Sequence, residues 1–333
     1  MHLARFARRR YTDGRTPLEP LPRLSEALGG PEIWIKRDDL TGLAAGGNKT
    51  RKLEFLVADA IEQGADLLIT TGAPQSNHCR LTLAAAAKDG LACRLLIEER
   101  VPGSYHADDV GNALLFDLMG ADRIEVVPAG SDLMAGMQRM AEEAEREGRK
   151  PYLIPGGGSN ALGSLGYVAC AEETMQQAFE QGVAFDHVVC ASGSGGTHAG
   201  LLAGLHGVNA GIPLTGVSVR AERAAQEEKI WRLAQAVCDL AGVAVDVPEE
   251  SVVVRDDQVG PGYSLPTAAM GEAVRLFART EAILLDPVYT GKAAAGLIAM
   301  VRDGSLREGQ RVLFVHTGGS PALHAYPDQV RPA

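Results

Sequence analysis

The chain has 333 residues, of which 46% are hydrophobic and 22% charged, and its formal net charge is −10. These values are ordinary for a globular protein, and the length predicts about two folding units. The negative charge argues against a nucleic-acid-binding surface, which needs clustered lysine and arginine. No apolar stretch approaches the ~20 residues that a membrane span needs, so we expect no membrane association.

The cysteines and the N-terminus indicate where the protein works. The five cysteines are scattered and form no CxxC pair, so neither a metal site nor a disulfide framework is predicted. The first ten residues are basic but lead into no apolar segment, and they therefore do not resemble a secretory signal. We expect a cytoplasmic protein with reduced thiols.

Short apolar runs alternate with segments of helical periodicity along the chain. The first run, 33–35, precedes a helical pattern over 51–63, and the run at 67–70 precedes another over 81–87. Further strand-like runs follow at 94–97, 124–127, 152–154, 187–190, 214–219 and 311–316. This alternation predicts an α/β protein built from βαβ units, with mostly parallel sheets covered by helices on both faces.

Glycine-containing loops follow several of these predicted strands, at the sheet edge where open α/β sheets bind ligands. They occupy residues 46–49, 155–160, 191–200 and 317–320. The segment 155–160 is predicted either as a hinge between two lobes or as a loop that lines a ligand.

The loop 191–200 has the composition of a phosphate-binding turn. Its glycines let backbone N–H groups converge ahead of a helix, and Ser194 and Thr197 add hydroxyl donors. It is not a Walker loop, and a dinucleotide fingerprint fits poorly because Val219 and Arg220 stand where an acidic residue would bind a ribose. A tight turn without a ligand is the alternative interpretation.

Lys49 is the strongest candidate for a reactive side chain. A lysine is usually a solvated surface residue, but two preceding glycines allow close backbone approach here. The N-terminus of the predicted helix, together with Arg51 and Lys52, would lower its pKa. A lysine that titrates near neutrality is suited to Schiff-base chemistry.

The segment 75–78 lies at the start of the helix that follows the run at 67–70. Ser76 is expected to cap this helix, while the backbone amides around Asn77 and His78 would receive a substrate carboxylate. A nucleophilic pair of His78 and Cys79 is disfavoured, because side chains adjacent in sequence rarely point together.

These motifs resemble those of the aminocyclopropane-carboxylate deaminase and D-cysteine desulfhydrase family. This family belongs to the tryptophan-synthase-β-like group of pyridoxal-phosphate enzymes. The matching segments occur in family order and cover nearly the whole chain: 35–39, 46–54, 75–78, 154–160, 192–200, 286–292 and 316–319.

The resemblance implies a fold and an organisation into domains. It implies two open, twisted, mostly parallel sheets with flanking helices. Residues 1–48 and 161–333 would form a large cofactor-binding domain and residues 49–160 a small domain, with the active site in the cleft between them. It also implies a homodimer.

The resemblance further implies pyridoxal phosphate as the cofactor, held as a Schiff base by Lys49. The cofactor-binding residues would be Lys49, Lys52, Asn77, Ser194, Gly195, Gly196, Thr197, Tyr289, Thr290 and Thr317. Of these, Lys52 and the residues 194–197 would hold the phosphate, Asn77 the phenolic oxygen, and Tyr289 would stack on the ring. A small amino-acid substrate would be bound by Ser76, Asn77, His78, Ser159 and Tyr263. The catalytic residues would be Lys49, Ser76, Tyr263 and Tyr289.

Two positions separate the subfamilies. The ring-opening deaminases carry glutamate after the stacking tyrosine and leucine before the last glycine pair, where this chain has Thr290 and Thr317. A glutamate facing the pyridine nitrogen keeps it protonated, which makes the ring a strong electron sink, whereas a neutral threonine hydroxyl cannot hold that charge. A weaker electron sink would impair the opening of a cyclopropane, which has a poor leaving group, more than the loss of a thiolate. We therefore expect elimination from D-cysteine, or from a close β-substituted D-alanine, to give pyruvate, ammonia and hydrogen sulfide.

Several alternatives stay open at this point. An L-cysteate sulfo-lyase that releases sulfite would use the same framework, with Arg220 meeting the additional anionic group. A ring-opening deaminase is a third possibility within the family. From other classes, a Rossmann-type oxidoreductase or a non-catalytic phosphate binder would share the glycine loops. Tyr263 or water would protonate the leaving group, and both D and L stereochemistry remain open.

Overall fold

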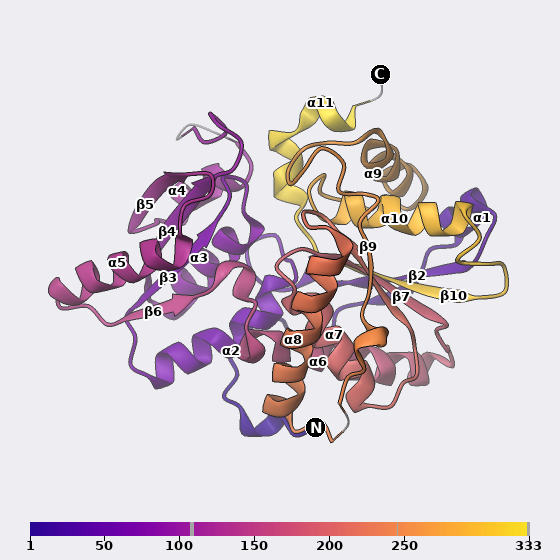
Figure 1. Cartoon of the computed structure of the whole chain (residues 1–333), viewed down its shortest axis with the longest axis horizontal. Helices are drawn as coiled ribbons and strands as arrows, with labels where there is room; N and C mark the ends of the chain where they lie inside the picture. Colours follow the sequence, from indigo (N-terminus) through magenta and orange to yellow (C-terminus); the bar gives the residue numbers. More distant parts are fainter. Residues whose placement is uncertain (107–109, 245, 332–333) are drawn as a thin grey trace.

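Residues 1–106, 110–244 and 246–331 are described by the computed structural model of the chain (Figure 1). Their strands form two sheets, with the orders β1-β2-β10-β7-β8-β9 and β5-β4-β3-β6. The larger sheet contains β1 (Leu18–Pro20), β2 (Glu32–Arg37), β7 (His187–Ser192), β8 (Leu214–Ser218), β9 (Val253–Arg255) and β10 (Arg311–His316). The smaller contains β3 (Leu67–Gly72), β4 (Ala92–Glu99), β5 (Arg123–Pro128) and β6 (Pro151–Ile154).

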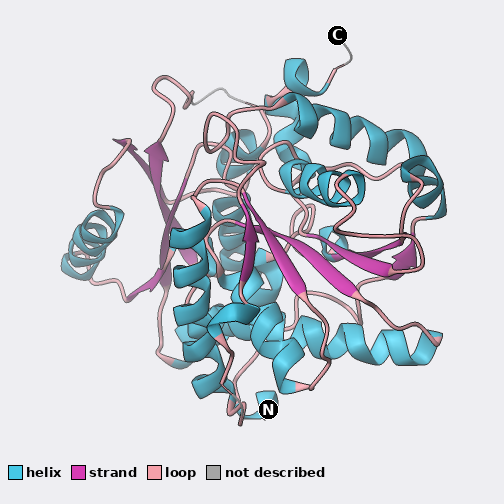
Figure 2. Ribbon diagram, turned by 45° about the vertical axis from the view of Figure 1, so that its right-hand side comes forward, coloured by secondary structure: helices cyan, strands magenta, loops and turns pink. Residues whose placement is uncertain are grey.

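Helices cover both sheets (Figure 2). They are α1 (Pro22–Leu28), α2 (Lys49–Glu62), α3 (Asn77–Asp89), α4 (Asn112–Leu118), α5 (Leu133–Arg146), α6 (Ala161–Gln181), α7 (Gly196–Gly207), α8 (Arg223–Ala241), α9 (Ala268–Glu281), α10 (Thr290–Arg302) and α11 (Pro327–Val330). Short 3₁₀ helices span Leu3–Arg5, Asp38–Leu40, Gly156–Gly158, Glu249–Ser251 and Ser320–Ala325.

The predicted class, α/β with two mostly parallel sheets, is confirmed. Among the described strands only β1 pairs antiparallel, with β2, and the other pairings are parallel. Each strand-like run predicted from the sequence falls on one of the observed strands. The helix expected from residue 51 begins at Lys49 instead, so that residue opens α2.

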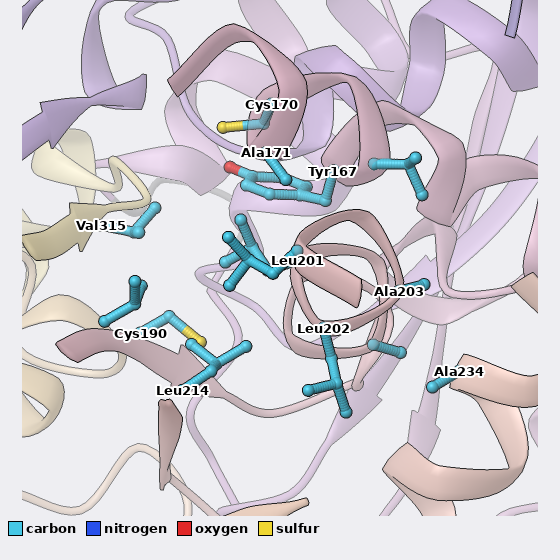
Figure 3. Packing of buried hydrophobic residues seen from close by; sticks show 14 of the residues in the cluster. Tyr167, Cys170, Ala171, Cys190, Leu201, Leu202, Ala203, Leu214, Ala234 and Val315 are labelled. Carbon is cyan, nitrogen blue, oxygen red and sulfur yellow. The ribbon is translucent and has the colours of Figure 1, made fainter. Parts of the chain in front are cut away.

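The centre of the larger sheet is buried on both faces, which explains why β7 and β10 are almost continuously apolar. One face of β7 turns Val188 and Cys190 toward α6, α7 and α8, where Tyr167, Leu201 and Leu202 fill the core (Figure 3). The opposite face turns Val189 toward a second cluster formed with α1, α9 and α10. Burial on both sides fixes the register of the central strands, and thereby the positions of the loops that follow them.

The helix α2 lies between the two sheets, and it packs against α6 and against α3. The smaller sheet uses only strands between residues 67 and 154, and the larger uses strands on either side of that stretch. The exact domain boundaries expected at residues 48 and 160 stay a prediction. No helix in the described residues combines the length and the apolar character that crossing a bilayer would require.

Candidate active site

A cavity of about 350 Å³ lies between the two sheets, beyond the carboxyl ends of their strands. Its wall includes Gly72 at the end of β3, Gly156 after β6, Gly193 after β7 and Arg220 after β8. This is the edge at which open α/β sheets bind ligands.

Most of the predicted site residues line this cavity or a small one beside it. The main cavity is lined by Lys49, Ser76, His78, Ser159, Ser194, Tyr263 and Tyr289. Gly195, Thr197 and Thr317, with Lys49 and Tyr289 again, line the adjoining cavity of about 20 Å³. The other four predicted residues, Lys52, Asn77, Gly196 and Thr290, line neither of the two. The loop 155–160 reaches the main cavity through Gly156, Gly157 and Ser159, as expected for a loop that lines a ligand.

The Lys49 amine faces an aromatic ring, with its Nζ 5.1 Å from the centre of the Tyr289 ring. Burial lowers the pKa of Lys49 to about 8, with Asp286 acting to raise it and Arg80 to lower it further. The sequence predicts the same direction but from different neighbours. Arg51, two residues along the helix, points away and pairs instead with Asp38 at 2.7 Å.

A pair of tyrosines forms the wall opposite Lys49. Tyr289 immediately precedes α10, Tyr263 lies in the loop before α9, and their hydroxyls are hydrogen-bonded. Their rings meet edge to face, with centroids 5.9 Å apart. The guanidinium carbon of Arg100 lies 4.5 Å from the centre of the Tyr263 ring. Arg100 follows β4 of the smaller sheet, whereas Tyr263 precedes α9, which covers the larger sheet. The contact therefore joins the part built on the smaller sheet to the part built on the larger one, and the sequence does not predict it.

The turn from β7 into α7 is built to receive an anion. The helix begins at Gly196, and Gly195 before it has a φ of 104°, which favours glycine. Ser159 Oγ accepts from the Gly196 N–H at 3.1 Å and donates to Ser194 Oγ at 2.8 Å. A Cβ at residue 196 would lie 2.8 Å from Lys52 Nζ and from Ser159 Oγ, so a larger residue here would have to displace these polar side chains.

Lys52 brings a buried amine to this turn. Its Nζ donates to Gly157 O and to Ser159 Oγ, each at 3.1 Å, and both acceptors are neutral. Burial, Lys49 and Lys229 together lower the pKa of Lys52 well below its ordinary value. A buried cation is costly without an anion, so Lys52, the hydroxyls and the N-terminus of α7 together fit a phosphate group.

The N-terminus of α3 borders the main cavity through Ser76 and His78, and the start of a helix is suited to an anion. Ser76 caps the helix as predicted, with its Oγ accepting from the Cys79 N–H at 3.1 Å. The first N–H groups of the helix, those of Asn77 and His78, have no intrahelical acceptor by their position. Burial raises the pKa of Cys79 to about 12, which keeps the thiol protonated and argues against a nucleophilic Cys–His pair.

Asn77 and Thr290 are held by neighbours that the sequence did not reveal. The Asn77 Oδ1 accepts from Arg80 Nη1 at 2.9 Å and from Asn112 Nδ2 at 2.8 Å. The Thr290 hydroxyl donates to Asp286 Oδ1 at 2.7 Å. The sequence offers one sign of this role of Asp286, which is its place at the start of the matching segment 286–292, just before a helix. Arg80, in contrast, looked like an ordinary helix residue.

The arrangement combines a buried lysine of lowered pKa, an aromatic ring facing it and a phosphate-binding turn. Such a site can bind a phosphorylated ring compound and link it covalently to the lysine amine. Within the described residues no group of three or more histidine, cysteine or acidic side chains could hold a metal ion.

This fold and this site define a class. The family model described as pyridoxal-phosphate dependent enzyme matches residues 10–318, and the chain belongs to that family. Its cofactor is therefore pyridoxal phosphate, as predicted. The chain is also similar over its full length to D-cysteine desulfhydrases. Those of Salmonella typhimurium (strain LT2) and Salmonella typhi are each 49% identical over 332 residues, which cover 99% of this chain and 99% of the relative.

A solved structure agrees with this assignment. A crystal structure described as that of an ACC deaminase homologue superimposes with a TM-score of 0.90 at 40% sequence identity. The match covers 98% of this chain and 96% of that one. The resemblance found in the sequence motifs is thereby confirmed at the level of the family and of the fold.

Proposed function

We propose that this enzyme is a carbon–sulfur lyase that converts D-cysteine and one water to pyruvate, ammonia and hydrogen sulfide. The observation that carries the proposal is the 49% identity, over 99% of both chains, to curated D-cysteine desulfhydrases. The bonds broken at the substrate are Cα–H and Cβ–S, and water then replaces the amino nitrogen. Pyridoxal phosphate, when bound, supplies the electron sink for the charge that develops at Cα.

Lys49 has two roles in the proposal. Its Nζ would hold the cofactor covalently, and its free amine would take the proton from Cα of the substrate. A pKa of about 8 suits both roles, because an appreciable fraction of the amine is neutral near physiological pH. The Lys49 side chain is buried, with 8% of its surface exposed, which limits the access of bulk water to its amine.

The substrate carboxylate would be held by the N-terminus of α3. Ser76 and the first amides of this helix line or adjoin the cavity, and the helix dipole favours an anion there. His78 contributes shape rather than charge. Burial holds its pKa well below the ordinary value, and its Nε2 lies 2.8 Å from Thr70 Oγ1.

The cofactor would lie between Tyr289 and the two glycine turns. The 194–197 turn, Lys52 and Ser159 would hold its phosphate, and Asn77 would donate Nδ2 to its phenolic oxygen, because Oδ1 is already occupied. Tyr289 would stack on its ring, and Thr317 would lie at its edge. Tyr263, whose hydroxyl is hydrogen-bonded to that of Tyr289, or a water molecule would protonate a departing thiolate.

The same proposal includes the setting of the enzyme. We propose a cytoplasmic homodimer, with the active site between a large domain of residues 1–48 and 161–333 and a small domain of residues 49–160. Five free, buried cysteines are consistent with a reducing compartment. Sedimentation at micromolar concentration tests the dimer.

The central experiment has two stages. The purified protein with pyridoxal phosphate should be yellow, and borohydride should fix the cofactor on Lys49, as read by peptide mass. Lys49→Ala should lose the visible band, whereas the matched control Lys88→Ala, on the exposed end of α3, should keep it.

The second stage is a substrate panel. D-cysteine, L-cysteine, β-chloro-D-alanine, L-cysteate and aminocyclopropane carboxylate are scored for pyruvate or 2-oxobutyrate. Pyruvate and sulfide from D-cysteine support the proposal. Reaction with L-cysteate alone would replace it by a sulfo-lyase, and 2-oxobutyrate from the cyclopropane would replace it by a ring-opening deaminase.

A further inference from the structure

Arg80 is a fully buried arginine at the end of the first turn of α3, and its hydrogen bonds all go to neutral oxygens. Its Nη1 donates to Asn77 Oδ1 at 2.9 Å and to Asn112 Oδ1 at 2.7 Å. Its Nη2 donates to Gly46 O at 2.6 Å. Its Nε, also buried, finds no hydrogen-bond partner in the part of the chain that the structure describes.

Burying Arg80 without a hydrogen-bonded carboxylate costs free energy of folding. Removing a guanidinium from water carries a large desolvation penalty, which a carboxylate partner normally offsets. Burial lowers the pKa of Arg80 to about 10, so the group is still charged near neutrality. Other buried arginines in this chain differ in this respect. Arg51 is paired with Asp38, and Arg94 with Asp122 at 2.6 Å.

The oxygens that accept hydrogen bonds from Arg80 show which parts of the site its burial holds in place. Gly46 lies three residues before Lys49 and has a φ of 65°, and its carbonyl accepts the hydrogen bond from Arg80. Asn77 has both of its Oδ1 acceptor positions filled, by Arg80 and by Asn112. The amide of Asn77 therefore cannot flip, and its Nδ2 must face away from Arg80. The space beside that Nδ2 is narrow, because a Cβ built at residue 319 would lie only 2.7 Å from it.

We propose that Arg80 is the positioning residue of this active site, which locks the Gly46 turn and the Asn77 amide in one geometry and places a positive charge beside Lys49. One side chain thereby joins the segment that carries the reactive amine to the segment proposed to bind the cofactor oxygen. The inference rests on the proposed role of Lys49, but not on the identity of the substrate.

The electrostatic part of the proposal has a definite sign. The titratable and charged groups that act on Lys49 or lie against it include Arg80, Asp286, Lys52, His78 and Tyr289. The same cavity is also lined by Arg100, Arg220, Lys229 and Tyr263, which Arg80→Met leaves in place. Asp286 raises the pKa of Lys49, and Arg80 lowers it. His78 is neutral near pH 7 and Tyr289 is protonated, because burial shifts the pKa of each toward the uncharged form. Removing the charge of Arg80 therefore leaves Asp286 less opposed, and Lys49 should hold its proton to higher pH.

The test measures Lys49 directly in the full-length protein without cofactor. The rate at which an amine-reactive reagent labels Lys49 is followed against pH by peptide mass. Arg80→Met should raise the midpoint by roughly one pH unit, the order of effect expected of a unit charge near a buried group. Arg94→Met, which also removes a buried arginine but far from the cavity, should leave the midpoint unchanged. An unchanged midpoint in Arg80→Met would overturn the electrostatic role.

A second variant tests the positioning role and remains informative if Arg80→Met does not fold. Arg80→Lys keeps the charge but loses the planar fork that reaches three acceptors at once. It should leave the labelling midpoint in place, while the bound pyridoxal phosphate dissociates about tenfold faster or more. Dissociation at the wild-type rate would overturn the positioning role. Because neither measurement uses a substrate, both outcomes are independent of whether D-cysteine is the one that reacts.

Discussion

The Thr290 hydroxyl donates to Oδ1 of Asp286 at 2.7 Å and accepts from the backbone N–H of the same residue at 2.8 Å. Its single proton is therefore committed inside the protein, and the carboxylate of Asp286 lies directly behind it. From the sequence, Thr290 was interpreted as a neutral neighbour of the cofactor ring. The structure adds that this neutral group is backed by a buried negative charge.

The Thr290–Asp286 pair should be worth a measurable part of the stability. Thr290→Val keeps the shape but leaves the Asp286 N–H and one carboxylate lone pair without a partner, and the free energy of unfolding should fall by about 1–3 kcal/mol. Thr290→Ser retains the hydroxyl and should lose clearly less. Urea denaturation of the two variants measures the difference, and equal losses would mean that the hydrogen bonds contribute nothing beyond packing.

Tyr263 should matter according to the leaving group. If its hydroxyl protonates the departing sulfur, Tyr263→Phe should lower kcat/KM for D-cysteine by about 10²–10⁴-fold. β-Chloro-D-alanine should be much less affected, because chloride leaves without a proton. Tyr152→Phe, which removes a half-buried hydroxyl bonded to Asp59, serves as the control. An equal loss for both substrates would assign Tyr263 a role in holding Tyr289 instead, with water as the acid.

We expect Lys52 to lower the stability of the cofactor-free protein and to raise its affinity for pyridoxal phosphate. Lys52→Met would remove the charge-assisted contact proposed between Lys52 and the phosphate, and the dissociation constant of pyridoxal phosphate should rise about 10–100-fold, equivalent to about 1.5–3 kcal/mol. The same change removes a buried cation without a counterion, so the cofactor-free variant should unfold at a higher temperature than wild type. Lys150→Met, at an exposed position, is the control for both measurements.

The pH dependence of that stability difference follows from the pKa of Lys52. The folded-state pKa lies well below the ordinary 10.5, so the unfolded chain binds the extra proton. Folding is therefore penalised below pH 10.5, and the penalty disappears as the pH rises to that value. The advantage of Lys52→Met over wild type should accordingly shrink between neutral and alkaline pH. A constant difference would contradict this origin.

The parts of the fold that could be predicted from the sequence are those whose pattern is local. The run at 187–190 is apolar because β7 is buried on both faces, and it was placed correctly. β1 and β9 were missed, because each has three residues and lies at an edge of the sheet, where a single neighbouring strand imposes little pattern.

The site divides along the same line. The glycine turns and Lys49 could be located because composition marks the ends of strands. Two contacts could not be located in this way. Arg80 and Gly46 are 34 residues apart in the sequence, and Arg100 and Tyr263 belong to segments that pack on different sheets. The source of the Lys49 pKa shift was misjudged for the same reason, since adjacency in sequence put Arg51 forward and the helix turns it away.

Asp38 lies at the centre of a buried ion network that includes Arg51 and Lys36, and its removal should affect stability strongly. Its carboxylate receives Arg51 at 2.7 Å, the Tyr167 hydroxyl at 2.7 Å and the Thr16 hydroxyl at 2.8 Å. Asp38→Ala would leave the guanidinium of Arg51 buried with only Glu173 to balance it. We expect a loss of about 3–5 kcal/mol in the free energy of unfolding. Asp66→Ala, which breaks a surface pair with Arg149, should cost at most about 1 kcal/mol.

The pH profile should separate the contribution of Asp38 from simple packing. Arg51 and Lys36 hold the pKa of Asp38 at about 2 against the cost of burial, below its ordinary value of 3.8. A carboxylate with a lowered folded-state pKa stabilises the protein fully above about pH 4, and that stabilisation is lost as the pH falls toward 2. Asp38→Asn keeps the shape without the charge, so its deficit relative to wild type should be constant above pH 4 and should narrow below it. A deficit that is unchanged down to pH 2 would mean that Asp38 acts by packing, and that Arg51 draws its compensation from Glu173.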